Sequence, residues 1–153
     1  MKYYCLILSL CVLITACDKD DDEPTKTELL TSGSWKFNDG GIDIDNNGAI
    51  DLAFGPGTLP ACLIDNSGTF NTNGTGVNDE GLTKCMPTDP QSTNFNWSFQ
   101  SNETVLSISG SGVLGISGQF KVLDLTDSKL TLSKDTTLTG FPSSVGLIVN
   151  LKH

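Results

Sequence analysis

Short apolar and polar alternation, interrupted by glycine, asparagine, aspartate and serine, runs through most of the chain from Gly33 onward. A period of two residues is typical of strands that bury one face, and the interrupting residues favour tight turns. The pattern predicts antiparallel strands at residues 34–38, 68–71, 76–78, 95–99, 104–109, 117–125, 129–133 and 145–152. Helical periodicity is limited to a short stretch at residues 28–30, so the chain is predicted to be almost entirely β.

Turn sequences connect several of these predicted strands. Asn73-Gly74 favours a two-residue type I′ hairpin, and Thr126-Asp127-Ser128 separates another pair of strands. About eight strands in one open sheet would leave long edges exposed to water, whereas closure removes them. The expected fold at residues 33–153 is therefore an all-β, small antiparallel barrel of about eight strands, with a sandwich as the alternative.

The first residues follow a different pattern. Lys2 precedes an almost continuous apolar run at residues 3–14, which ends in the small residues Thr15 and Ala16. A membrane-spanning helix needs roughly 20 apolar residues, and this run is shorter and is followed at once by acidic residues. We interpret residues 1–16 as a secretion signal peptide.

The end of this signal, Leu13-Ile14-Thr15-Ala16-Cys17, resembles the lipobox of bacterial lipoproteins. The resemblance implies cleavage before Cys17 and lipidation of that residue, so that the membrane becomes a partner through an acyl anchor. An ordinary secretory signal is the alternative interpretation. Residues 17–32 then form a lipidated cysteine and an acidic, solvated tether ahead of the domain.

The tether also suggests a location. Lys19-Asp20-Asp21 resembles the export signal of lipoproteins that some Gram-negative bacteria move to the outer leaflet of the outer membrane. The resemblance implies a lipid anchor in the outer membrane with exposure on the cell surface, and the periplasmic face is the alternative.

Cysteine positions agree with an oxidising compartment. Of the five cysteines, Cys5 and Cys11 would leave with the signal and Cys17 would carry lipid, which leaves Cys62 and Cys85. Two remaining cysteines outside the cytoplasm predict one disulfide. The proline-containing segment 54–90 around this disulfide is interpreted either as a lid over the barrel mouth or as a stapled hairpin edge.

Two further motifs resemble a known family. Gly33-Ser34-Trp35 is similar to the Gly-x-Trp motif of lipocalins. The second motif is a hairpin at Phe70–Gly76 followed by a strand pair from Trp97 to Leu106. This order resembles the lipocalin-like domains of lipoproteins from Gram-negative, Bacteroidota-type bacteria. The resemblance implies a lipocalin-like barrel that binds a ligand in its mouth.

The segment 43–51 follows the order of a calcium loop, with acidic, amide and carbonyl ligands around a glycine. Its candidate ligands are Asp43, Asp45, Asn47, the carbonyl of Ala49 and Asp51, and Gly48 allows the bend. Phe54 stands where such loops supply a bidentate glutamate, so a bound Ca²⁺ would be held weakly. An Asn-Gly turn in an acidic loop is the alternative interpretation.

Several function classes are excluded by composition. The chain has a formal net charge of −9 and no arginine, which disfavours nucleic-acid binding. Its only histidine, His153, is the last residue, and no nucleophile and base stand in a triad order. We therefore expect no enzymatic activity.

The expected function is non-catalytic binding of a small apolar molecule, a glycan or a protein partner at the cell envelope. The candidate ligand-lining residues are the aromatic residues of the predicted strands, each of which is alternatively a core residue: Trp35, Phe70, Trp97 and Phe99. An open cavity would favour a ligand carrier, and a filled barrel would favour a structural or interaction module or an inhibitor. An envelope hydrolase is the remaining alternative.

Overall fold

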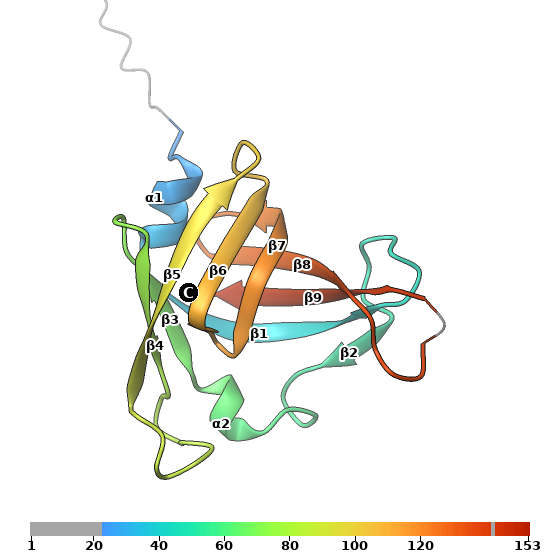
Figure 1. The fold of residues 1–153 in the computed structure, drawn as a ribbon, viewed down its shortest axis with the longest axis horizontal. Coiled ribbons are helices and arrows are strands. Elements are labelled where there is room, and N and C mark those ends of the chain that lie inside the picture. Colours follow the sequence, from blue (N-terminus) through green and yellow to red (C-terminus); the bar gives the residue numbers. More distant parts are fainter. Residues whose placement is uncertain (1–22, 142) are drawn as a thin grey trace, which may run out of the picture.

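Nine antiparallel strands form one sheet that closes into a barrel in the computed structural model, which describes residues 23–141 and 143–153 (Figure 1). The strands are β1 (Ser34–Asp43), β2 (Leu52–Phe54), β3 (Ser67–Phe70), β4 (Thr75–Asp79), β5 (Ser92–Gln100), β6 (Val105–Val113), β7 (Ile116–Leu125), β8 (Lys129–Thr136) and β9 (Val145–Lys152). From β3 to β9 each strand pairs with the next one along the chain. The prediction of an all-β, small antiparallel barrel is confirmed.

β1 closes the ring by pairing on both of its sides. Its first residues, 34–36, pair with β3, and residues 36–43 pair with β9. The closed ring therefore contains eight strands, and β2 is an additional short strand that pairs with β1 at residues 40–42. The predicted first strand ended at residue 38, whereas β1 continues through a bulge between Phe37 and Asp39 because β9 supplies its hydrogen-bond partners.

The hairpin between β3 and β4 differs from the predicted type I′ turn. Gly74 has a positive φ of 82°, but Asn73 is not among the residues with positive φ, which a type I′ turn requires at both positions. The amide of Gly74 donates to the carbonyl of Asn71, and the amide of Asn71 donates to the carbonyl of Thr75. The loop therefore contains three residues and bends at the glycine. Its Asn73 side chain accepts a hydrogen bond from the Thr75 amide.

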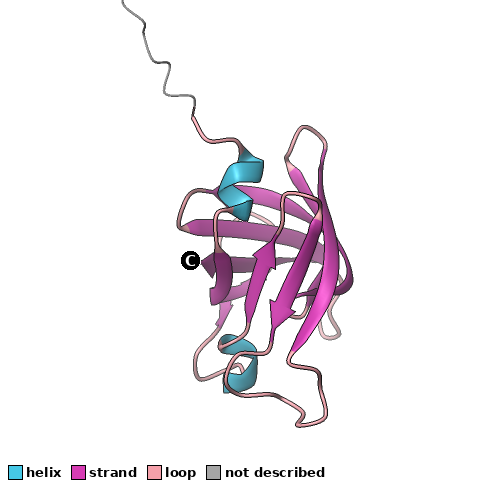
Figure 2. Ribbon diagram, turned by 90° about the vertical axis from the view of Figure 1, so that its left-hand side faces the viewer, coloured by secondary structure: helices cyan, strands magenta, loops and turns pink. Residues whose placement is uncertain are grey.

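One end of the barrel is covered by the short helix α1 (Lys26–Thr31), as Figures 1 and 2 show. The helix begins with a capping box, in which Thr25 and Glu28 exchange hydrogen bonds. The backbone amide and hydroxyl of Thr25 lower the pKa of the Glu28 carboxyl from its usual value. Leu30 is fully buried, and its carbonyl accepts a hydrogen bond from Nε1 of Trp35 at 2.8 Å. We call this the closed end of the barrel.

The helix α1 belongs to the segment 17–32 that was predicted as a tether. The structure packs it against the barrel, so that the folded domain begins before residue 33. The predicted signal peptide, the predicted lipidation site Cys17 and the first acidic residues, up to 22, lie outside the described residues. Within the described ranges, no helix has the length and apolar character needed to cross a membrane.

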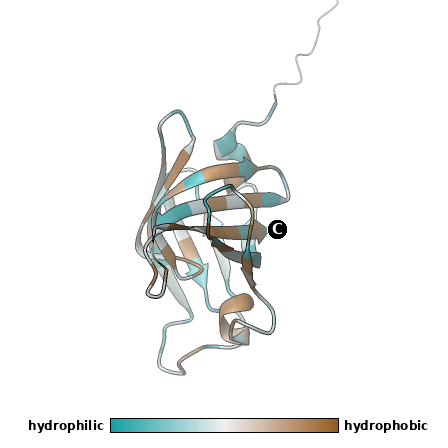
Figure 3. Cartoon of the chain, turned by 90° about the vertical axis from the view of Figure 1, so that its right-hand side faces the viewer, coloured by the Kyte–Doolittle hydropathy of each residue, from teal (hydrophilic) through white to brown (hydrophobic). Residues whose placement is uncertain are grey.

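Apolar and polar positions alternate along much of the strands (Figure 3), and the buried apolar side chains form the core of the barrel. Two glycines make room for this packing. A Cβ on Gly76 would lie 2.1 Å from the ring of its cross-strand partner Phe95, and a Cβ on Gly68 would lie 2.1 Å from Val113. The buried core consists of Leu30, Trp35, Phe70, Phe95, Trp97, Leu106, Ile108, Val113, Phe120, Leu130, Leu132, Val149 and Leu151.

Candidate ligand site at the barrel mouth

The end of the barrel opposite α1, which we call the mouth, contains an apolar pocket. It lies beside the short helix α2 (Ala61–Ile64) and is lined by residues of β1, β2, β9 and the turn from β6 into β7. Its volume is about 110 Å³, somewhat below the roughly 150 Å³ of an engineered apolar cavity that binds benzene. Eight apolar side chains line it: Phe37, Phe54, Leu59, Leu63, Leu114, Ile116, Leu147 and Val149.

The sheet supplies one wall of this pocket through regular alternation. Leu147 and Val149 are two residues apart on β9 and therefore face the same side of the sheet. Phe37 comes from the neighbouring strand β1, and its ring stacks on that of Phe54 with centroids 6.3 Å apart. Phe37, Leu147 and Val149 form this wall, and they also pack with the buried core.

An irregular segment supplies the opposite wall. Phe54 ends β2, and the following turn is held by hydrogen bonds from Thr58 and Leu59 to the carbonyl of Gly55. This turn leads to Pro60, after which the one-turn helix α2 carries Leu63 to the rim. Leu59 and Leu63 line the pocket although neither belongs to a strand, so the segment 54–90 contributes to the mouth as well as to the edge of the barrel.

A disulfide fixes this wall. Cys62 on α2 is bonded to Cys85 with Cα atoms 5.1 Å apart, which confirms the predicted pairing. The Asp65 carboxylate, just after α2, accepts hydrogen bonds from the amides of Leu82 and Thr83 in the loop that carries Cys85. α2 is therefore joined to the loop at residues 80–91 by one covalent bond and by polar contacts.

The four aromatic residues proposed from the sequence do not line this pocket. Trp35, Phe70 and Trp97 are buried in the core, and Phe99 packs against that core while partly exposed. Nε1 of Trp97 donates to the carbonyls of Asn71 and Thr75, which satisfies its polar group inside the barrel. The rings of Phe70 and Phe99 each lie 5.7 Å from Trp97 in edge-to-face geometry. These residues fill the barrel rather than surround a space.

The acidic loop brings three of its five candidate ligands together. Carboxylate oxygens of Asp43, Asp45 and Asp51 lie within 4.8 Å of one another. Asp43 is 3% exposed and accepts hydrogen bonds from the amides of Asn47 and Gly48, at 3.1 and 2.7 Å.

The other two candidate ligands have different surroundings. Oδ1 of Asn47 accepts a hydrogen bond from the amide of Ala49, and its amide nitrogen faces Asp45. Phe54, which stands in place of a glutamate ligand, lines the apolar pocket instead. The loop thus presents a carboxylate cluster whose oxygens already bind loop amides and retain further lone pairs.

The pocket-lining residues were missed in the sequence because half of them come from turns and short elements without alternation. The strand residues Leu147 and Val149 followed the alternating pattern, but nothing distinguished them from core positions. One signal was available in the sequence. The apolar residues Leu59 and Leu63 lie in a proline-containing segment, close to Cys62, which was predicted to form a disulfide.

The pocket is chemically inert, because none of its eight lining side chains carries a titratable or hydrogen-bonding group. Such a surface can bind an apolar group by excluding water, and it offers no acid, base or nucleophile. The fold and the site thus define an antiparallel barrel with an apolar pocket at its mouth. No protein-family model matches the chain, and no curated protein matches it.

Proposed function

We propose that this chain is a non-catalytic binding protein of the bacterial cell envelope that takes a small apolar group into the mouth of its barrel. The apolar pocket of about 110 Å³ carries this proposal, because covering an exposed apolar surface with an apolar ligand removes both surfaces from water and is favourable. The Gly33-Ser34-Trp35 resemblance to lipocalins supports the same interpretation, since ligands of such barrels enter at the mouth.

Filling the pocket with a larger side chain tests the proposal. Leu63 lies on the rim and is 39% exposed, so that a Leu63→Trp variant can place its ring in the pocket without disturbing the core. We expect wild-type protein to bind 1-octanol weakly in isothermal titration calorimetry, and Leu63→Trp to bind it at least about tenfold less tightly because the ring occupies the site.

The matched control is Leu123→Trp, which makes the same exchange at a 49% exposed position of β7 that does not line the pocket. This variant should bind octanol like wild type. Equal octanol affinities for wild type and Leu63→Trp, or no binding to wild type, would contradict the proposed function.

A structural or interaction module, or an inhibitor, is the second candidate function. It is favoured by the packing below the pocket, where aromatic and aliphatic side chains fill the barrel. In that case a glycan or protein partner would bind the outer surface or the loops, and octanol would not bind. The calorimetric titration therefore separates the two candidates.

We further propose that the protein is a lipoprotein anchored to the outer membrane through Cys17 and exposed on the cell surface. The lipobox and the following Lys19-Asp20-Asp21 support this location. Protease treatment of intact cells should remove the protein while a periplasmic marker survives. Survival of the wild-type protein during this treatment would place it on the periplasmic face. In a separate labelling experiment, a Cys17→Ser variant should no longer incorporate labelled fatty acid.

Calcium binding at the loop 43–51 is the remaining proposal, and it rests on the convergence of three carboxylates. With a Kd of roughly 10⁻⁴ to 10⁻³ M, 10 mM Ca²⁺ should stabilise the fold by about 1–3 kcal/mol and raise Tm by several degrees. Asp45→Asn removes one exposed carboxylate and should abolish most of this shift in thermal melting. An unchanged Tm of the wild type at 10 mM Ca²⁺ would exclude the site.

A further inference from the structure

Lys134 occupies an inward-facing position on β8. In the β8–β9 register, Leu130 faces Leu151, Leu132 faces Val149 and Lys134 faces Leu147. Cross-strand partners share one side of the sheet, and so do alternate residues of a strand. Lys134 therefore continues the row of buried leucines by one layer toward the mouth, where it is only partly exposed.

The amine of Lys134 lies over the inner side of β7. Its Nζ donates to the carbonyl of Ser117 at 3.1 Å and lies 5.4 Å from the centre of the Phe120 ring. A Cβ on Gly118 would lie 2.7 Å from Nζ, so this glycine provides the space that the amine uses.

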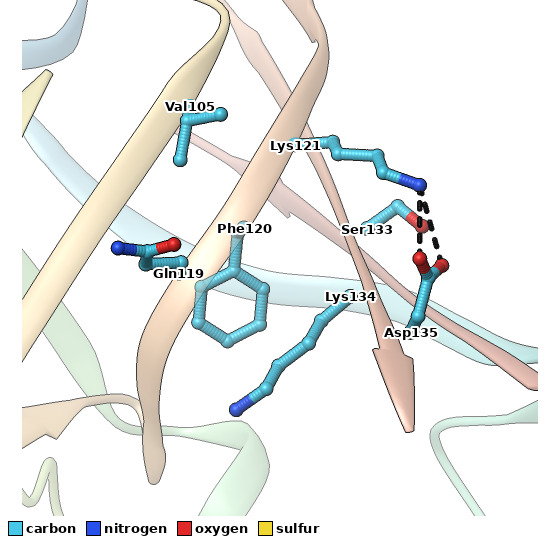
Figure 4. A pocket seen from close by; sticks show the side chains of 7 residues that line it. All are labelled: Val105, Gln119, Phe120, Lys121, Ser133, Lys134 and Asp135. Carbon is cyan, nitrogen blue, oxygen red and sulfur yellow. Dashed lines mark hydrogen bonds and ion pairs between the residues drawn. The ribbon is translucent and has the colours of Figure 1, made fainter. Parts of the chain in front are cut away.

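The charge of Lys134 has no carboxylate beside it in the described part of the chain, whose two ion pairs are Lys121–Asp135 and Lys129–Asp124. Figure 4 shows the Lys134 side chain reaching from β8 toward β7 and pointing away from the pair of Lys121 and Asp135. The ammonium group has three N–H donors, and an anion placed next to it can accept a charge-assisted hydrogen bond from a donor that Ser117 does not use.

The barrel wall is open at this lysine. β7 and β8 pair through residues 121–125 and 130–133, whereas residues 116–120 and 134–136 are not paired with each other. A hollow of about 230 Å³ lies there, lined by Lys134 together with Gly115, Ile116, Ser117, Phe120, Thr136 and Leu147. Ile116 and Leu147 also line the apolar pocket, so the hollow and the pocket are neighbours across these two side chains.

We propose that the mouth binds a single-chain amphiphilic anion, with the end of its aliphatic chain in the apolar pocket, the rest of the chain in the adjoining hollow and its carboxylate at Nζ of Lys134. This inference rests on the proposed function and specifies its ligand class. The apolar residues select the chain, and the inward-facing amine selects the charge. A chain with a net charge of −9 repels anions over most of its surface, so the lysine defines where the headgroup lies.

Three ligands of equal chain length test this assignment in detergent-free buffer: octanoate, 1-octanol and octylammonium. Calorimetric titration of wild-type protein should give octanoate an affinity about five- to tenfold above that of octanol, with octylammonium the weakest, because a charge-assisted hydrogen bond adds to the apolar contact. Lys134→Met keeps the length of the side chain and removes its charge. This variant should bind octanoate at least about fivefold less tightly than wild type and should retain octanol binding.

Lys121→Met is the matched control, because Lys121 is exposed on the same gap but paired with Asp135. It should preserve the preference for octanoate, and Lys134→Gln provides a second neutral variant if the methionine disturbs folding. Octanol binding without a preference for octanoate, or an unchanged preference in both Lys134 variants, would overturn the ligand class and leave the proposed function standing. Failure of wild type to bind either octanol or octanoate would overturn both.

Discussion

Replacing Trp35 with alanine is expected to destabilise the protein by about 3–5 kcal/mol. Trp35 is fully buried at the closed end, and its Nε1 donates to the carbonyl of Leu30 in α1. The variant loses the apolar area of the ring, leaves a cavity and leaves that carbonyl without its donor. Urea unfolding followed by the fluorescence of Trp97 measures the change in the free energy of unfolding.

Two further variants control this result. Trp35→Phe keeps an aromatic ring but removes the donor, and it should show a smaller loss of about 1–3 kcal/mol. Leu123→Ala truncates a half-exposed leucine and should stay within about 0.5 kcal/mol of wild type. If Trp35→Ala unfolded at the same urea concentration as Leu123→Ala, the closed end would not be packed as described.

Loss of the disulfide is expected to have the second largest effect. The bond joins Cys62 to Cys85, which are 23 positions apart, and removing a loop closure of this length costs about 2–4 kcal/mol on the chain-entropy model. We expect the double variant Cys62→Ser, Cys85→Ser to show this loss in urea unfolding. It should also bind octanol less tightly, because α2 carries Leu63 at the pocket rim.

Chemical reduction supplies the matched comparison for the cysteine variant. Wild type unfolded in dithiothreitol should show the stability of the double variant, whereas the double variant should not respond to the reductant. A double variant as stable as oxidised wild type would mean that the polar contacts of Asp65 alone hold α2 to the loop.

Strand positions in the second half of the chain could be predicted because one physical signal dominates there. Residues 129–133 alternate clearly between apolar and polar, and residues 117–125 and 145–152 are rich in apolar residues between turn sequences; the three ranges lie within β8, β7 and β9. Closure of the sheet also followed from the cost of exposed edges. The sequence could not show how far β1 extends, because residues 39–43 are polar or glycine-rich and depend on β9 for hydrogen bonds.

The candidate site was harder to predict, because it combines strand residues, which follow the alternating pattern, with residues from turns and short elements, which do not. Trp35, Phe70 and Trp97 have the aromatic character of ligand-binding residues, but their ring N–H groups and edges find partners within the core. Leu59 and Leu63 come from a segment without periodicity, and only the disulfide and the fold place them at the mouth. The disulfide itself was predictable, because Cys62 and Cys85 are the two cysteines outside the predicted signal peptide and lipidation site.

Lys134 illustrates the same limit for charged residues. In sequence it lies at the polar end of an alternating strand beside Asp135, which makes it resemble an ordinary surface lysine. Its pairing with Leu147 shows that Lys134 faces inward. By contrast, Lys121 on β7 and Lys129 at the start of β8 are exposed, and each forms an ion pair with an aspartate. The pairing of strands, rather than the local sequence, therefore distinguishes an inward-facing lysine from a solvated one.

A nuclear Overhauser experiment on wild-type protein with bound 1-octanol tests whether the ligand lies in the mouth of the barrel. We expect intermolecular contacts between the alkyl protons of octanol and the methyl groups of Leu59, Leu114 and Ile116 at the mouth. Methyl groups at the closed end, such as those of Leu30, should show none. Contacts only with exposed side chains such as Leu82, or no intermolecular contacts at saturating octanol, would contradict a ligand site in the barrel mouth.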